Sequence, residues 1–382
     1  MLFRRFDRTD ATTKRYRETQ LEFLDRSADL AVGAVRALLE NAFDAYIESE
    51  KFEISQRLKS RRAHAFKSAC FELLLYGMLV RQGYTLVAHP DPANGTDKRP
   101  DFLVTPPDGE PFFLEAIVVN EGRDIDGGAE AMKEDVLDAL DRAPHPAFYL
   151  DIEQGGQPAT QPSARALIRD VHAWINGLDA GAVVREIAIH GHGAYPRHAW
   201  HHQGWTLAFG AIPKNNNRGE LDRLIGLLSI GGGAVDLKTP IREAIRNKGR
   251  RYGTLPHPLV VAISVTAFHL RDLDETDALF GSEGMAIDAD RNARLVRAPD
   301  GAWHDGREPR SARVSAAWLF NDLDFYSLPV RRQTLYLNPW ASAPLQNPPE
   351  WLPLVCVEEE RFVRTEGMTP GQAFGLPGSI NR

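Results

Sequence analysis

The stretch Arg99–Val104, RPDFLV, is followed by Phe112–Val119, FFLEAIVV, and both runs have the composition of β-strands. The residues PPDG between them are a strong turn signal, so the two runs are expected to be neighbouring strands. Each run places one carboxylate, Asp101 or Glu115, among apolar residues. A carboxylate in an apolar setting is costly unless a cation or a hydrogen-bond donor compensates it. These two acids are therefore the first candidates for a functional site.

A third carboxylate lies in the helical segment that precedes the strands. The pattern from Phe52 to Gln82 predicts a second long helix, after a helical stretch from Thr13 to Ser49, and its first half is basic and its second half apolar. Glu72 shares its face of this helix with Leu75 and Tyr76, so it is expected to be buried. Three carboxylates in apolar settings predict a divalent-cation site, because a hard cation accepts oxygen ligands and removes their mutual repulsion.

Composition places the chain among ordinary globular proteins. It has 382 residues, 43% hydrophobic and 25% charged, which predicts one large domain or two. The net charge of −7 gives no overall attraction for nucleic acid, so such binding would need local basic patches. Cys70 and Cys356 lack metal-binding spacing, which favours a reducing compartment. The sequence shows neither a secretory signal nor an apolar run of roughly 20 residues, so we expect a cytoplasmic location and no membrane contact.

The order of the remaining elements predicts an α/β fold, a mixed sheet flanked by helices. We expect an N-terminal helical extension at 1–62, an α/β core at 63–280 and a loop-rich region with short strands, packed on the core, at 281–382. The expected helices are Gly127–Ala143, Pro162–Leu178 and Thr239–Arg251. The expected strands outside the opening stretch are Tyr84–Ala88, Ala147–Ile152, Val183–Ile189, Trp205–Ile212, Leu259–Val265, Val314–Phe320 and Thr334–Leu337.

A helix with a glutamate, then Pro-Asp on one strand and an acid on the next, resembles the PD-(D/E)xK nuclease superfamily, which has the restriction-endonuclease-like fold. The resemblance covers about Ala63 to Val119. It implies that Asp101 and Glu115 bind Mg²⁺ or Mn²⁺ and that Glu72 is an additional acid of the site. It also implies hydrolysis of phosphodiester bonds in nucleic acid, DNA in the first place, in a bacterial defence or DNA-processing role. The metal would lower the pKa of the attacking water and stabilise charge on the phosphate.

The sequence departs from the family at one position. The family's lysine, two residues after the second acid, is replaced by Ile117. Some members carry this lysine elsewhere in the chain and others have lost catalysis. Candidates for a displaced cation are Lys98, Lys133 and, on the basic helix, Lys248 with Arg246. We rank Lys248 first, because its helix precedes another core strand.

Two other interpretations compete with a nuclease. In the first, the chain is a catalytically degenerate member that binds nucleic acid or a protein. The acids themselves also have a purely structural interpretation, in which Glu72 and Glu115 pair with core arginines and Asp101 caps a turn after Pro100. In the second, a metal site forms around His190 and His192, which would share one side of a strand, with His201 on a hairpin partner. The region 190–202 is rich in Gly and Pro, however, and lacks an acid-bearing metal motif, so a solvated loop is the favoured interpretation. The basic segments Arg57–Lys67 and Arg242–Arg251 could contact phosphates.

Overall fold

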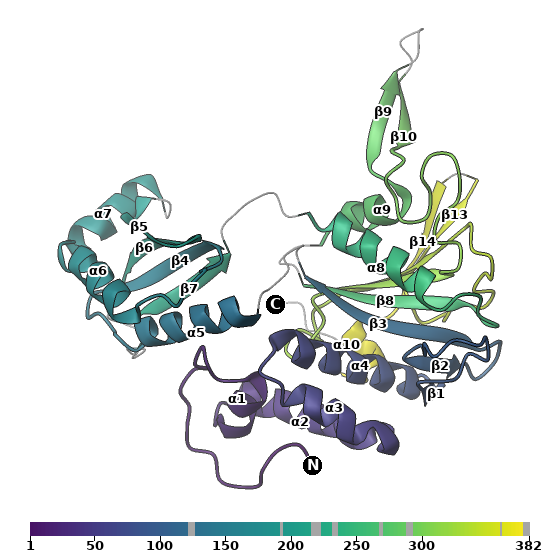
Figure 1. The fold of residues 1–382 in the computed structure, drawn as a ribbon, viewed down its shortest axis with the longest axis horizontal. Coiled ribbons are helices and arrows are strands. Elements are labelled where there is room, and N and C mark those ends of the chain that lie inside the picture. Colours follow the sequence, from purple (N-terminus) through teal and green to yellow (C-terminus); the bar gives the residue numbers. More distant parts are fainter. Residues whose placement is uncertain are drawn as a thin grey trace. The chain divides into compact units, whose positions relative to one another are not determined.

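The computed structural model describes residues 1–120, 127–191, 194–214, 223–230, 236–266, 270–287, 293–359 and 361–376. The chain forms two compact units. The first consists of Met1–Thr12, Thr19–Arg123 and Asp236–Arg382, and the second of Thr13–Glu18 and Asp124–Val235. The second unit is therefore inserted between strand β3 (Phe112–Asn120) and helix α8 (Lys238–Arg251) of the first (Figure 1).

Helices open the first unit. They are α1 (Gln20–Arg26), α2 (Leu30–Ala45), the short 3₁₀ helix η1 (Glu48–Glu50), α3 (Lys51–Leu58) and α4 (Ala63–Arg81). The single helix predicted from Phe52 to Gln82 is wrong, because the chain breaks between α3 and α4. At the break the Ser60 hydroxyl accepts a hydrogen bond from the backbone N–H of Arg62, 3.1 Å away. Such a local bond offers the backbone an alternative to the helix.

Helix α4 is the central helix of this unit. Among the described residues it is the helix whose length and apolar composition would allow it to span a membrane. Its residues from Ala69 to Leu75 are buried, and all of them except Glu72 belong to the main hydrophobic cluster of the first unit. The apolar character of α4 is therefore accounted for by its packing in the core.

The first unit is built on a mixed sheet of eight strands in the order β1-β2-β3-β8-β11-β12-β13-β14 (Figure 1). Strands β1, β2 and β3 are successively antiparallel, β3, β8 and β11 are parallel, and β12 is antiparallel to β11. Strand β13 runs parallel to β12 and forms a hairpin with β14. The bounds are β1 (Thr85–Ala88), β2 (Phe102–Thr105), β8 (Leu259–Thr266), β11 (Ala316–Asn321), β12 (Gln333–Leu337), β13 (Leu354–Glu358) and β14 (Arg361–Thr365). The mixed α/β class expected from the sequence is confirmed.

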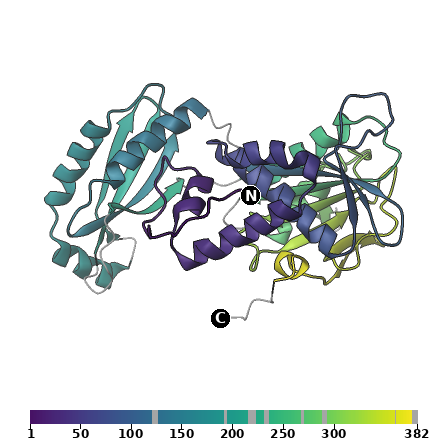
Figure 2. The same ribbon diagram turned by 90° about the horizontal axis from the view of Figure 1, so that it is seen from below.

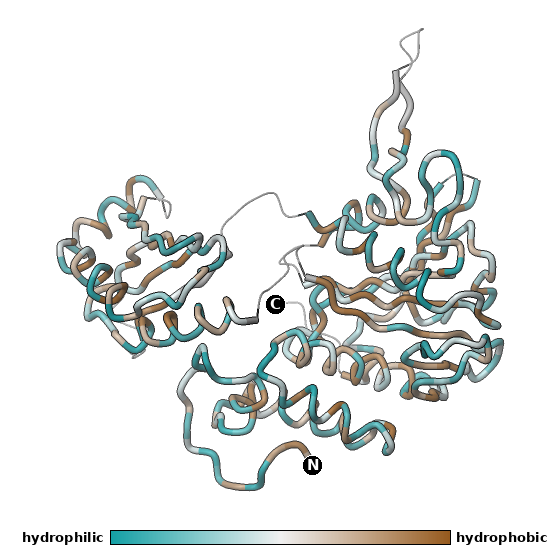
Figure 3. Tube along the Cα trace, in the orientation of Figure 1, coloured by the Kyte–Doolittle hydropathy of each residue, from teal (hydrophilic) through white to brown (hydrophobic). Residues whose placement is uncertain are grey.

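Helices cover both faces of this sheet, α4 one and α8 the other (Figure 1). Side chains alternate between the faces along each strand. On β3, Leu114 and Val118 pack in the cluster that contains α4, whereas Phe113 and Val119 pack in the cluster that contains α8. Figure 3 shows the concentration of hydrophobic residues along β3 and β8. It follows that Glu115, like Phe113, lies on the α8 face of β3.

The second unit has a sheet of four strands in the order β5-β6-β4-β7, with three helices in the same hydrophobic cluster (Figure 2). Its elements are α5 (Gly127–Asp141), β4 (Phe148–Gly156), α6 (Ala164–Asn176), α7 (Ala180–His190), β5 (Arg197–His202), β6 (Trp205–Pro213) and β7 (Ile225–Ile230). The strand predicted at Val183–Ile189 is wrong, since these residues lie in α7. Asp179 caps α7 by accepting from the N–H of Gly181 at 2.9 Å, a start signal that the apolar run concealed.

The units also differ from the three segments expected from the sequence. Residues 124–235, assigned to the core, form the separate second unit. The C-terminal part, expected to be loop-rich with short strands packed on the core, supplies β11–β14 to the main sheet, and the predicted strands Val314–Phe320 and Thr334–Leu337 correspond to β11 and β12. It also contains α9 (Asp272–Phe280), the hairpin β9 (Glu283–Ile287) and β10 (Ala293–Arg297), and α10 (Pro370–Ala373). Short strands bounded by Gly and Pro look like loops in the sequence, although their neighbours in the sheet hold them in register.

Two helical glycines provide a test of the packing of α10 on α4. A Cβ at Gly77 of α4 would lie 2.6 Å from the buried ring of Phe374, whereas at Gly33 of α2 the nearest atom would be 3.5 Å away. Alanine favours a helix over glycine by about 1 kcal/mol. We expect Gly33→Ala to raise the free energy of unfolding and Gly77→Ala to lower it by about 1–3 kcal/mol, as measured by urea denaturation. Equal effects of the two substitutions would contradict this packing.

Candidate functional site

Asp101 and Glu115 come together across strands β2 and β3. Phe102 pairs with Leu114 in the antiparallel register, so Asp101, one residue earlier, lies opposite Glu115, one residue later. The Asp101 Oδ2 atom accepts a hydrogen bond of 2.7 Å from the backbone N–H of Ala116. The two carboxylates predicted as metal ligands are therefore neighbours, and Asp101 is anchored to the strand that carries Glu115.

Glu115 is only 2% exposed, and two side chains from the α8 segment compensate its burial. Lys248 Nζ donates to Glu115 Oε1, and the Tyr252 hydroxyl donates to Glu115 Oε2. A third group, Arg251 Nη1, lies 4.0 Å from Oε1. The contact expected for Lys248 is thus present, whereas its role in catalysis stays a prediction.

The periodicity of α8 explains why Lys248 reaches the acids. Ile241 and Ile245 are fully buried against the sheet, and Lys248 and Tyr252 continue the same face at spacings of three and four. Arg242 and Arg246 contact a different segment of the chain. They donate to the backbone oxygens of Asp300 and Gly301, at 2.8 and 2.9 Å respectively. Arg246, an alternative cation in the sequence, is therefore engaged away from the acids.

The electrostatics of the pair centre on Asp101. The pKa of Asp101 is raised to about 7. Burial is the largest cause of this shift, and the negative charge of Glu115 is the second. The hydrogen bond from Ala116 acts in the opposite direction.

Glu72 is engaged in a different interaction. Its Oε2 atom accepts from Arg57 at 2.6 Å and its Oε1 atom from the Tyr46 hydroxyl at 2.5 Å. Glu72 is buried as predicted, and its charge contributes to the raised pKa of Asp101. In the part of the chain that the structure describes, however, no group of three or more His, Cys, Asp or Glu side chains is placed to hold a metal ion. The expected three-acid set of Asp101, Glu115 and Glu72 is therefore not assembled.

The remaining cations predicted from the sequence lie elsewhere or are already paired. Lys98 is exposed in the loop before Asp101. Lys133 belongs to the second unit, where its ammonium lies 3.6 Å from Glu130. In the basic segment Arg57–Lys67, Arg57 binds Glu72, and Lys67 binds Asp322 at 3.2 Å. Ile117 is half-buried against the α8-side cluster, as its position two residues after Glu115 requires.

The histidine segment differs from its prediction. His190 is the last residue of α7, His192 lies outside the described residues, and Arg197–His202 forms edge strand β5 instead of a loop. His198 lies 2.7 Å from Asp170 and stacks on Trp174, so it packs within the second unit. The shared strand face proposed for His190 and His192 does not exist, because His190 lies in a helix.

Tyr252 is the residue of the site that sequence reasoning missed. It directly follows the basic segment Arg242–Arg251, and it was not among the residues predicted for the site. A usable signal was its spacing, since Tyr252 lies one helical turn after Lys248. If Lys248 contacts Glu115, this spacing predicts that Tyr252 also lies near Glu115.

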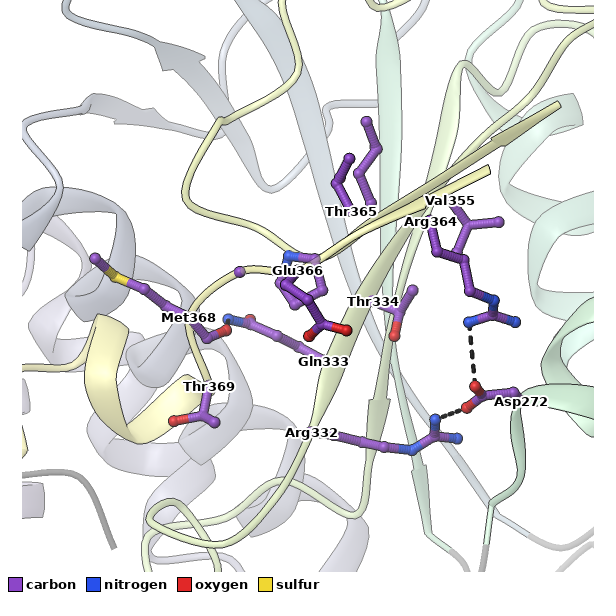
Figure 4. A pocket seen from close by; sticks show the side chains of 13 residues that line it. Asp272, Arg332, Gln333, Thr334, Val355, Arg364, Thr365, Glu366, Met368 and Thr369 are labelled. Carbon is purple, nitrogen blue, oxygen red and sulfur yellow. Dashed lines mark hydrogen bonds and ion pairs between the residues drawn. The ribbon is translucent and has the colours of Figure 1, made fainter. Parts of the chain in front are cut away.

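A separate cavity of about 240 Å³ lies beside β12 and β14. Figure 4 shows that Arg332 and Arg364, which line it, both reach Asp272. The Arg364–Asp272 distance is 3.1 Å, and Arg332 also lies 3.0 Å from Glu275. Both guanidinium groups that line this cavity are therefore already paired with acids.

Comparisons with protein-family models, with curated proteins and with solved structures found no match to this chain.

The raised pKa of Asp101 predicts a pH dependence of stability. A carboxyl with a higher pKa in the folded state adds stability that is fully present below the unfolded pKa of 3.8 and is lost as the pH rises through about 7. Asp101→Asn removes this titration. We therefore expect the variant to gain stability relative to wild type between pH 5 and pH 8, by about 2–3 kcal/mol. Metal-free urea denaturation at several pH values measures this difference, and a difference that stays constant with pH would contradict it.

Proposed function

We propose that this protein is a metal-dependent nuclease of the PD-(D/E)xK type, in which Lys248 replaces the lysine that is missing at Ile117. The observation that supports the proposal most directly is the Lys248 ammonium on Glu115, beside Asp101. The order of α4, the Pro-Asp segment leading into β2, and β3 agrees with the resemblance found in the sequence. The restriction-endonuclease-like fold, the cytoplasmic location and a role in bacterial defence or DNA processing are parts of the same proposal.

The residues present fit a small hard cation. Mg²⁺ is usually held by one or two carboxylates and keeps several of its waters, so it does not require Glu72 as a third ligand. Asp101 and Glu115 are adjacent, and the pKa of Asp101 is raised partly by repulsion from Glu115, which a bound cation would relieve. When bound, Mg²⁺ or Mn²⁺ would lower the pKa of a water and stabilise negative charge on a phosphate.

The chain's own residues would bind and orient the substrate around this pair. Arg250 and Arg251 are exposed at the end of α8, and Lys98 and Arg99 are exposed just before Pro100-Asp101. Lys98 and Arg99 precede Asp101 in the chain, whereas Arg250 and Arg251 follow Lys248, and these four cations could contact phosphates of nucleic acid, which we take to be DNA. Lys248 would hold positive charge next to Glu115 at the reacting phosphate.

The test is cleavage of several DNA and RNA substrates with Mg²⁺ or Mn²⁺. We expect Asp101→Asn, Glu115→Gln and Lys248→Met each to lower the rate by at least about 100-fold, because each removes charge from the reacting centre. The matched control is Lys238→Met, which removes a lysine of the same helix that pairs with Asp277 at 2.9 Å. Cleavage that Asp101→Asn and Glu115→Gln leave unchanged would place the activity elsewhere.

The Glu72→Gln variant tests whether Glu72 is a metal ligand or an acid with a structural role. Glu72 binds Arg57 and Tyr46, so its neutralisation leaves the partly buried Arg57 guanidinium with the more exposed Glu53, 3.4 Å away. We expect the free energy of unfolding to fall by about 3 kcal/mol and the cleavage rate per folded molecule to change less than in Asp101→Asn. Urea denaturation and cleavage at low temperature measure the two effects. A loss of cleavage as large as that in Asp101→Asn would instead indicate that Glu72 is a ligand of the metal.

A degenerate nuclease-like fold that only binds is the second candidate, and Ile117 at the lysine position favours it. Lys248 is already bound to Glu115, so in this alternative it neutralises a buried acid and has no substrate to act on. Binding of DNA that depends on Arg250 and Arg251, without metal-dependent cleavage of any substrate, would support the binding module over the nuclease.

A further inference from the structure

We propose that Tyr252 is a positioning residue for Glu115 and that Asn94 holds the turn of chain on which Tyr252 sits. The inference rests on the proposed function, because positioning matters only if Glu115 binds a cation. It adds two residues that neither the sequence motif nor the carboxylate pair assigns. Neither would touch the reacting atoms, since both act through Glu115.

The hydroxyl of Tyr252 is the second side-chain donor that binds the Glu115 carboxylate. The Tyr252 ring is 1% exposed and packs in the hydrophobic cluster on the α8 side of the sheet. Lys248 donates to one Glu115 oxygen and Tyr252 to the other, so the carboxylate plane is fixed at both ends. A carboxylate that is already fixed loses less freedom when it binds a ligand.

Asn94 connects this arrangement to the chain before Asp101. Its Nδ2 atom donates to the backbone oxygens of Tyr252 and Thr254 at 2.5 and 3.0 Å. Its Oδ1 atom accepts from the N–H and the hydroxyl of Thr96 at 3.3 and 3.1 Å. Every donor of the amide is thus used, and its oxygen accepts twice. Asn94 therefore ties the loop between β1 and β2 to the C-terminal end of α8.

Asn94 therefore bears on the distance between Asp101 and Glu115. Asp101 follows the loop that contains Asn94, whereas Lys248 and Tyr252, which hold Glu115, come from α8. Asn94 joins these two segments, which are far apart in the sequence. Loss of the Tyr252 hydroxyl would leave one Glu115 oxygen buried without this donor, and loss of Asn94 would free the α8 end from the loop.

Mn²⁺ affinity, measured by titration calorimetry without substrate, tests the role of Tyr252. Tyr252→Phe keeps the buried ring and removes the hydroxyl. Partners that orient a metal ligand typically contribute 10–100-fold in metal affinity, so we expect Mn²⁺ binding to weaken at least about 10-fold. The matched control is Tyr336→Phe, because the Tyr336 hydroxyl donates to another buried acid, Glu275, at 2.6 Å. It should lose comparable stability and keep its Mn²⁺ affinity within about two-fold.

The role of Asn94 is tested in the same titration. We expect Asn94→Ala to weaken Mn²⁺ binding several-fold, and Thr96→Ala, which keeps both bonds from Asn94 Nδ2 to the α8 end, to leave it unchanged. Asn94→Asp retains the acceptor and loses the donors, so it should behave like the alanine variant.

The outcomes separate this inference from the proposed function. If the wild type binds Mn²⁺ and Asp101→Asn does not, the metal site stands, and an unchanged affinity in Tyr252→Phe overturns only the positioning role. Equal losses in Tyr252→Phe and Tyr336→Phe would show a general effect of stability and would also overturn it. If the wild type binds no Mn²⁺, both the metal site and the positioning role fall.

Discussion

One constraint shapes this part of the structure: a buried carboxylate, Glu115, and a half-buried one, Asp101, lie opposite each other on neighbouring strands. Asp101 and Glu115 repel each other, and the pKa of Asp101 rises to about 7 as a result of its burial and that repulsion. The antiparallel register of β2 and β3 fixes their proximity, and a slip of one residue would send one acid to the other face of the sheet. Helix α8 must then supply donors to that face, which it does through Lys248 and Tyr252.

The insertion of the second unit follows from the same topology. Strands β3 and β8 are parallel neighbours, and parallel neighbours require a long crossover connection. Helix α8 lies in that connection, and the second unit occupies the chain between β3 and α8. An insertion at this point leaves the β3–β8 pairing unchanged. It does separate Glu115 from Lys248 in the sequence, which hides their contact from any short motif.

Prediction from the sequence succeeded where a local pattern determines the structure. The acid-bearing strands, the buried helix acid and the basic helix are all present, because apolar periodicity and turn residues fix them locally. It failed at Val183–Ile189, where an apolar run suits a strand or a buried helix equally, and only the cap at Asp179 decides. The partners of Glu72 and Glu115 depend on tertiary packing, so the sequence could suggest Lys248 but could not establish the contact.

Three buried glutamates of the first unit share one arrangement, and comparing them shows what is distinctive at the candidate site. Glu72, Glu115 and Glu275 each accept from one cationic side chain and one tyrosine hydroxyl. Burial with these partners is therefore a general way in which this fold accommodates an acid, and it does not by itself indicate function. Glu115 differs because a second carboxylate, Asp101, faces it, and among the described residues no ion pair joins Asp101 to a cation. The case for a metal site therefore rests on Asp101, which faces Glu115 and accepts a backbone hydrogen bond from Ala116 in place of an ion pair.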